Sequence, residues 1–247
     1  MNPLLMKVNP VLEVCVDSVE SAVAAQKGGA QRVELCANRG EGGTTPSAAM
    51  MEQVRKRVSI QLFAMIRPRP GDFCYSSAEF VVMRRDIEIA KDLGVDGVVV
   101  GILTNRRAVD AKRMKILQRT AFPLPVTFHR AFDQSRNPLE ALETIVQLGV
   151  SRLLTSGQKQ TALEGLPLLA TLVERSQGRT IVMPGGGVDA QNAGLIMKVT
   201  GSSEIHVNSA VQREVRQIDA GKKWSLGSYE VVDSTKVRRI VKAMKSI

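Results

Sequence analysis

The stretch Gly-Gly-Ala-Gln-Arg-Val-Glu-Leu at residues 28–35 shows a local pattern that occurs at two later places in the chain. The other copies read Leu-Gly-Val-Asp-Gly-Val-Val-Val (93–100) and Leu-Gly-Val-Ser-Arg-Leu-Leu-Thr (148–155). In each copy a glycine suits the left-handed residue that ends a helix, and a small apolar residue then leads into a buried strand. This pattern is typical of the connection from a helix to the next strand in a parallel α/β protein.

Strands and helices read outward from these copies alternate along the chain. Strands are expected at 12–16, 32–36, 61–66, 97–101, 125–129, 152–155, 180–183 and 204–207. Helices are expected at 18–27, 47–57, 77–93, 110–118, 138–148, 163–175, 191–199 and 235–245. Eight such units in 247 residues predict an α/β protein of the (β/α)8 TIM-barrel class. A doubly wound open sheet is the alternative, but it usually has a glycine fingerprint after its first strand, and none follows 12–16.

The composition is that of a soluble globular protein, with 44% hydrophobic and 23% charged residues. No Pro/Ser-rich linker divides the chain, so we expect a single domain over residues 1–247. No apolar run approaches the roughly 20 residues that span a bilayer, and the first eight residues lack the pattern of a signal peptide. Three cysteines suit a reducing compartment, so we expect a cytoplasmic protein without a membrane partner.

A net charge of +10 invites a nucleic-acid interpretation. The basic residues, however, are scattered in pairs and triplets such as Arg55-Lys56-Arg57, mostly on expected helices, where they suit a solvated outer face. Six Phe, two Tyr and one Trp offer few rings for base stacking. We therefore expect no nucleic-acid partner.

Polar residues stand at matching places near the ends of the expected strands, and they include both histidines of the chain. Active sites of TIM barrels lie where the C-terminal strand ends meet, so five of these residues are candidate catalytic residues: Glu13, Glu34, Arg67, His129 and His206. A buried acid and a histidine can move protons, and Arg67 can clamp an anion. Two acids beside Arg67 would instead form a structural charge network, and His206 would then be a core histidine.

Cys15 and Cys36 occupy equivalent positions on neighbouring expected strands, which lie about 4.8 Å apart in a sheet. Two thiolates at that separation suit a soft ion such as Cu(I). Oxidation would instead join them in a disulfide, and free cysteine is also a common small buried residue. The spacing leaves all three alternatives open.

Two further loops form a candidate anion-binding site. Gly185, Gly186 and Gly187 follow the seventh expected strand, and Asn208 and Ser209 follow the eighth. Loops in these two places of a TIM barrel frequently bind phosphate through free backbone N–H groups. A tight turn before the next helix is the alternative.

Seven collinear segments carry a specific resemblance: 12–18 (Leu-Glu-Val-Cys-Val-Asp-Ser), 32–36 (Arg-Val-Glu-Leu-Cys), 41–47 (Glu-Gly-Gly-Thr-Thr-Pro-Ser), 65–76 (Met-Ile-Arg-Pro-Arg-Pro-Gly-Asp-Phe-Cys-Tyr-Ser), 126–133 (Val-Thr-Phe-His-Arg-Ala-Phe-Asp), 154–157 (Leu-Thr-Ser-Gly) and 183–187 (Met-Pro-Gly-Gly-Gly). From about residue 12 to residue 209 the chain closely resembles the CutC family of copper homeostasis proteins. The resemblance implies a cytoplasmic TIM barrel that is linked to copper tolerance, binds Cu(I) and forms a homo-oligomer, either a dimer or a tetramer. It makes Cys15 and Cys36 the preferred copper ligands.

Two functions of different classes follow. The first is a cytoplasmic Cu(I)-binding protein of copper homeostasis, with the copper ion as its partner. The second is a TIM-barrel enzyme acting on a small anionic or phosphorylated metabolite at the C-terminal mouth of the barrel. A third, weaker interpretation is a catalytically inactive barrel that serves as an oligomeric scaffold.

Overall fold

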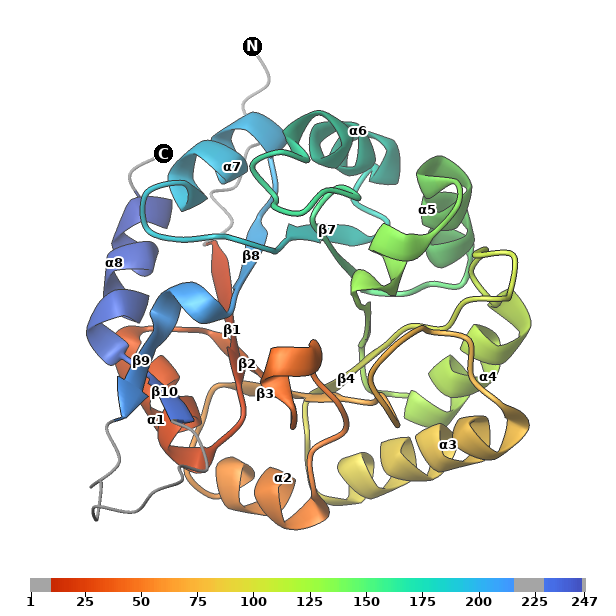
Figure 1. Ribbon diagram of the computed structural model, residues 1–247, viewed down its shortest axis with the longest axis horizontal. Coiled ribbons are helices and arrows are strands. Elements are labelled where there is room, and N and C mark those ends of the chain that lie inside the picture. Colours follow the sequence, from red (N-terminus) through yellow and green to blue (C-terminus); the bar gives the residue numbers. More distant parts are fainter. Residues whose placement is uncertain (1–9, 216–228, 246–247) are drawn as a thin grey trace, which may run out of the picture.

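Parallel strands form the centre of the molecule and helices surround them, as Figure 1 shows. The computed structural model describes residues 10–215 and 229–245. The barrel strands are β1 (Val11–Val16), β2 (Arg32–Leu35), β3 (Gln61–Met65), β4 (Gly97–Val100), β5 (Val126–Phe128), β6 (Arg152–Thr155), β7 (Ile181–Pro184) and β8 (Glu204–Val207). The helices are α1 (Val19–Gly28), α2 (Ala48–Arg55), α3 (Ser77–Asp92), α4 (Ala111–Ala121), α5 (Pro138–Gln147), α6 (Leu166–Ser176), α7 (Ala193–Thr200) and α8 (Ser234–Met244).

The sheet runs in the order β7-β6-β5-β4-β3-β2-β1-β8, and every hydrogen-bonded pair is parallel. Within the described residues no backbone ladder joins β7 to β8, although the two strands lie side by side. A side-chain contact bridges them, because Ser202 Oγ donates to the Val182 carbonyl at 2.6 Å. The barrel is therefore nearly closed, and the predicted TIM-barrel class is confirmed.

The glycines that suggested this fold act as predicted. Gly29, Gly94 and Gly149 follow α1, α3 and α5 and have φ values of +97°, +76° and +71°. Residues with a Cβ rarely adopt this left-handed conformation, whereas glycine adopts it without steric cost. Each predicted strand and helix overlaps an observed one.

Alternation along each strand separates two buried regions. One set of side chains, which includes Val14, Leu35 and Val98, packs against the helices. The opposite set faces the barrel interior, where Cys15, Cys36, Phe63, Met65 and Val99 form a separate apolar cluster. Glu13 has the same parity as Cys15 on β1, and Glu34 has the same parity as Cys36 directly after β2, so the predicted strand phase is correct.

An ionic network occupies the barrel interior beside this cluster. Arg32 is fully buried, and its guanidinium forms ion pairs with Glu13 and Glu204. Arg152 Nε also donates to Glu204, at 2.8 Å. The sequence interpretation that placed two acids beside Arg67 was wrong, because Arg32 is the cation that reaches Glu13. Arg32 lies directly opposite Glu13 in the parallel register of β1 and β2.

The last strands were not predicted. β9 (Gln212–Val215) and β10 (Tyr229–Val232) form an antiparallel hairpin, and β10 contacts α1. In the described part of the chain, no helix has both the length and the apolar character needed to cross a membrane. The signal-peptide interpretation concerns the first eight residues, which lie outside the described residues.

We expect Arg32→Met to lower the free energy of unfolding by about 3–5 kcal/mol, because it leaves two buried carboxylates without their shared cation. Urea denaturation measures this change. The matched control is Arg85→Ala, whose ion pair with Glu88 is exposed on α3, so its effect should stay within about 0.5 kcal/mol. Equal effects of the two substitutions would contradict the structural role of the network.

Candidate functional site

A cavity of about 670 Å³ lies at the C-terminal mouth of the barrel. Six of the residues predicted for the site line it, namely Cys15, Glu34, Arg67, His129, His206 and Asn208. The loops after β2 and β3 form part of the wall through residues 41–42 and 71–74. Glu13 and Cys36 do not line the cavity, but both contact residues that do. The C-terminal strand ends therefore bring the predicted residues together.

The two cysteine sulfurs are in contact. Cys15 Sγ and Cys36 Sγ lie 3.6 Å apart, and both side chains are buried. The prediction that they occupy equivalent strand positions was wrong by two residues, since the register pairs Cys15 with Glu34. They meet because the strands are staggered around the barrel. The hydrogen bond with Cys36, followed by burial, raises the pKa of the Cys15 thiol.

The loop after β2 packs tightly over Cys36. At Gly43, whose φ is +83°, an added Cβ would lie 3.3 Å from Cys36 Sγ. The position therefore requires glycine both for its conformation and for its close approach to the sulfur.

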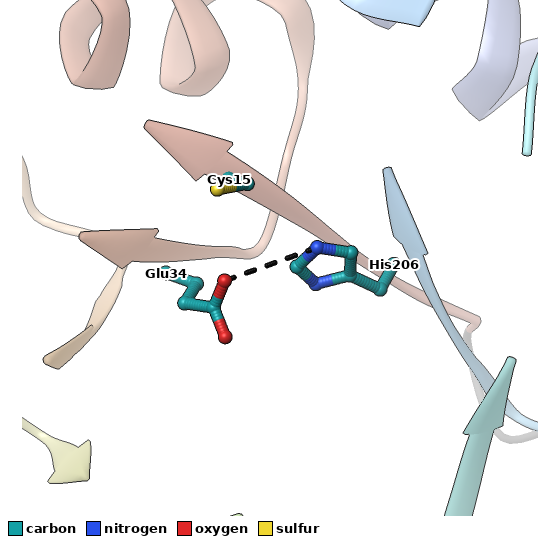
Figure 2. A group of neighbouring side chains, drawn as sticks. All are labelled: Cys15, Glu34 and His206. Atoms are coloured by element: carbon teal, nitrogen blue, oxygen red, sulfur yellow. Dashed lines mark ion pairs between the residues drawn. The ribbon is translucent and has the colours of Figure 1, made fainter. Parts of the chain in front are cut away.

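His206 lies between two carboxyl groups. Its Nδ1 donates to Glu13 Oε1 at 2.7 Å, and its Nε2 lies 3.9 Å from Glu34 Oε2, the contact that Figure 2 marks. Burial lowers the pKa of His206, but Glu34 and Glu13 outweigh it, so the pKa is raised overall. Nδ1 is held by Glu13, so Nε2 is the ring nitrogen that faces Glu34.

The pKa values of the two carboxyl groups beside His206 are shifted in opposite directions. Burial raises the pKa of Glu34 to about 7, although His206 opposes the shift. Burial also acts on Glu13, but Arg32 and His206 outweigh it and lower the pKa to about 2. Glu13 is thus a fixed anion that orients His206, whereas the Glu34 carboxyl changes its charge near neutral pH.

Cys15, Glu34 and His206 form a group that could hold a metal ion. The ligand atoms of the three side chains all lie within 4.8 Å of one another, and Figure 2 shows them converging from β1, β2 and β8. From the sequence, Cys15 was predicted as a metal ligand, and Glu34 and His206 were predicted as catalytic residues. The structure brings them together, with Cys15 shared between this group and the cysteine pair.

His129 is held as a neutral hydrogen-bond donor. Its Nδ1 accepts from the Ala131 backbone N–H at 3.1 Å, so the proton of the neutral ring lies on Nε2. Burial, followed by the nearby Arg67 cation, lowers the pKa of His129 to about 3. The ring lies against Gly101, where an added Cβ would be 2.4 Å from Nδ1. The neutral ring thus carries an N–H at Nε2, and a role of His129 as acid or base stays a prediction.

Arg67 links two loops of the mouth. Its Nη1 donates to the Glu41 and Gly43 carbonyls and its Nη2 to the Gly71 carbonyl, each at 2.9 Å. Among the described residues no carboxylate forms an ion pair with Arg67, and its Nε has no partner. The cation also lies over the ring of Phe73, 5.0 Å from the centroid.

The predicted anion-binding loop is only partly at the cavity. Asn208 lines it and accepts from Arg39 at 3.2 Å, whereas Gly185, Gly186, Gly187 and Ser209 are not part of its wall. An added Cβ at Gly185 would collide with Leu154, and would also lie 3.2 Å from His206 Cβ. Anion binding by this loop stays a prediction.

Two residues that shape the site were not predicted from the sequence. Arg32 holds Glu13 and thereby His206, and Phe73 contacts both Arg67 and His129. Arg32 has the same strand parity as Glu34, which was a usable signal for an inward side chain. Phe73 lies in a loop, where no periodicity predicts direction.

Fold and site together define a TIM-barrel protein with a candidate soft-metal centre and a polar cavity at the C-terminal mouth. The chain belongs to the CutC family, whose model matches residues 10–211.

Named relatives agree with this membership. A human protein named "Copper homeostasis protein cutC homolog" is 46% identical over 245 residues, which cover 96% of this chain and 90% of the human protein. A CutC family protein of Chromobacterium violaceum is 50% identical over 202 residues, 82% of each chain.

Solved structures agree as well. The putative copper homeostasis protein CutC of Streptococcus agalactiae matches with a TM-score of 0.76 at 32% identity, over 80% of this chain and 98% of that chain. N-(5'-phosphoribosyl)anthranilate isomerase of Pyrococcus furiosus matches with a TM-score of 0.61 at 15% identity, over 96% of this chain and 100% of that chain. The second match shows a shared fold alone.

We expect the pKa of His129 to lie below the ordinary histidine value and the pKa of His206 to lie above it. His129 should stay neutral from about pH 5 upwards, and His206 should keep its proton above about pH 6.5, because their neighbours carry opposite charges. Long-range ¹H–¹⁵N NMR spectra across this pH range measure both rings, and His129→Asn assigns the signals. A midpoint near 6.5 for His129 would contradict its neutral state.

The lowered pKa of His129 also makes the free energy of unfolding depend on pH. Its folded pKa of about 3 lies below the ordinary 6.5, so the unfolded chain binds more protons between these values. The contribution of His129 is therefore fully present above about pH 6.5 and is lost as the pH falls towards about 3. Urea midpoints should fall less steeply with acid in His129→Asn than in the parent chain.

Proposed function

We propose that this protein binds Cu(I) and takes part in copper homeostasis, with the ion held by Cys15 and Cys36. The observation that carries the proposal is the pair of buried sulfurs 3.6 Å apart at the barrel mouth. In this proposal copper is the cargo of the site and not a resident cofactor.

The donor set fits Cu(I). Thiolates are the soft ligands that select this ion, whereas Zn(II) sites almost always have four ligands in a tetrahedron. Cys15 lines the cavity, which gives an ion a path to the buried pair. His206 belongs to the group around Cys15 and would become a third donor through Nε2 once that nitrogen loses its proton. Binding would displace the thiol protons, so affinity should rise with pH.

The relatives support the cellular role. The human and mouse relatives carry the name copper homeostasis protein, and the chain spans 90% of each of them. A cytoplasmic location belongs to the proposal because a reducing compartment keeps the two thiols free to bind metal. A homo-oligomer, dimer or tetramer, also remains part of the proposal.

We expect one Cu(I) per chain, lost in Cys15→Ser and in Cys36→Ser, because each substitution removes one of two soft ligands. Anaerobic titration against a competing Cu(I) chelator measures stoichiometry and affinity. Cys74→Ser is the matched control, since Cys74 is outside the sulfur pair and should leave both values unchanged. Unchanged binding in all three variants would rule out the site.

A second candidate function is an enzyme acting on a small anionic or phosphorylated substrate. The observation that favours it is the cavity of about 670 Å³, in which buried Arg67 and His129 each have an N–H group without a partner. Convergent polar groups in such a cavity are typical of a small-molecule site. Calorimetry with a panel of small carboxylates and phosphorylated metabolites tests it, and the absence of any binder would remove it.

A further inference from the structure

Three side chains of different chemistry converge at the mouth of the barrel. Cys15, Glu34 and His206 all line the cavity, and their ligand atoms lie within 4.8 Å of one another (Figure 2). The strand register places them there, since Cys15 lies opposite Glu34 between β1 and β2, and His206 lies opposite Glu13 between β8 and β1. Side chains that neighbouring strands position in this way are suited to holding one ion.

The imidazole of His206 is oriented in the manner of a metal ligand. Its Nδ1 donates to Glu13 Oε1 at 2.7 Å, and Arg32 forms an ion pair with the same carboxylate. A histidine that binds a metal almost always donates its other ring N–H to a carboxylate, a backbone carbonyl or water, which fixes the ring. The chain therefore already supplies the outer contacts of a metal site, and Nε2 is the nitrogen that is left for the ion.

The carboxyl group of Glu34 is poorly satisfied by the protein. Among the described residues no lysine or arginine forms an ion pair with it, and its buried Oε1 has no hydrogen-bond partner. Its Oε2 lies 3.9 Å from His206 Nε2, which is longer than a hydrogen bond. A buried carboxylate without full compensation costs free energy, and a bound cation would offset that cost.

The distances suit a small divalent ion. Nitrogen and oxygen ligands bind Zn(II) at about 2.0–2.1 Å, so two of them across a tetrahedral ion lie about 3.3 Å apart. Nε2 of His206 and Oε2 of Glu34 are 3.9 Å apart, and side-chain shifts of less than about 1 Å bring them to that separation.

The mixed donor set selects the class of ion. Thiolate, imidazole and carboxylate together suit a borderline ion such as Zn(II), whereas Mg(II) and Ca(II) take oxygen ligands and Cu(I) is selected by sulfur ligands. Three protein ligands leave a fourth position, which is the arrangement of catalytic Zn(II) sites. All three residues line the cavity, so water or a small molecule can reach an ion that they hold.

We propose that Cys15, Glu34 and His206 form a site for one borderline divalent ion such as Zn(II), with an open fourth position. Cys15 also belongs to the sulfur pair, so this ion and a Cu(I) ion at the pair exclude one another. The inference goes beyond both candidate functions and rests on neither. It would give the second of them a Lewis acid that polarises a carbonyl or phosphoryl oxygen of a substrate.

Anaerobic titration of the reduced full-length chain with Co(II) tests the site, because Co(II) substitutes for Zn(II) and has visible absorption bands. We expect one Co(II) per chain, with the charge-transfer band of a thiolate ligand, and displacement of Co(II) by Zn(II). Glu34→Gln keeps the size of the side chain but removes the carboxylate ligand. It should lower the Co(II) affinity by at least about tenfold, since the loss of an outer contact alone has an effect of this size.

The two cysteines provide a matched pair of variants, because their sulfurs are only 3.6 Å apart. Cys15→Ser should remove both Co(II) binding and the charge-transfer band, whereas Cys36→Ser should keep both. Glu34→Gln should keep its Cu(I) affinity, which also shows that this variant is folded. Addition of Cu(I) to the parent chain loaded with Co(II) should release the Co(II).

Other results would overturn the inference. Equal loss of Co(II) in the two cysteine variants would assign the divalent ion to the sulfur pair, and unchanged affinity in Glu34→Gln would remove the carboxylate from the site. A chain that holds Co(II) and Cu(I) together would contradict the shared ligand. Failure of the parent chain to bind Co(II) or Zn(II) would remove the site and would leave the Cu(I) proposal to its own titration.

Discussion

The buried guanidinium of Arg32 is the interaction on which the geometry of the site depends. It neutralises Glu13 and Glu204 inside the barrel, where an unpaired carboxylate would be costly. Glu13, held as an anion, then accepts from Nδ1 of His206. This directs Nε2 of His206 towards Glu34 and Cys15. A charge pair in the interior thus determines which ring nitrogen reaches the mouth.

The mouth has two walls with different chemistry. The wall formed by β1, β2 and β8 carries sulfur, carboxyl and imidazole groups that suit a soft metal ion. The wall formed by the ends of β3 and β5 carries the guanidinium of Arg67 and the neutral imidazole of His129. Because the two walls use different residues, substitution in one should leave binding at the other intact. The copper-binding proposal and the enzyme proposal therefore depend on different residues of one barrel.

The two histidines show how neighbours set protonation in such a site. Both are buried, and burial alone lowers the pKa of an imidazole. His206 faces two carboxyl groups, which reverse that effect, whereas His129 faces the Arg67 cation, which adds to it. Family membership does not distinguish these states, and the distant barrel enzymes share only the fold. The distinction comes from the charges within contact of each ring.

The sequence by itself determined the barrel, because recurring helix-ending glycines and strand alternation are local properties that fix element type and facing. It also placed Glu13, Cys15, Glu34 and Cys36 on interior faces correctly. Only the tertiary structure decided which of them touch. The stagger of the strands pairs Cys15 with Glu34 and Arg32 with Glu13, and the loop paths give Arg67 carbonyl partners instead of acids. Register and loop paths arise from contacts between distant segments, and no local pattern encodes them.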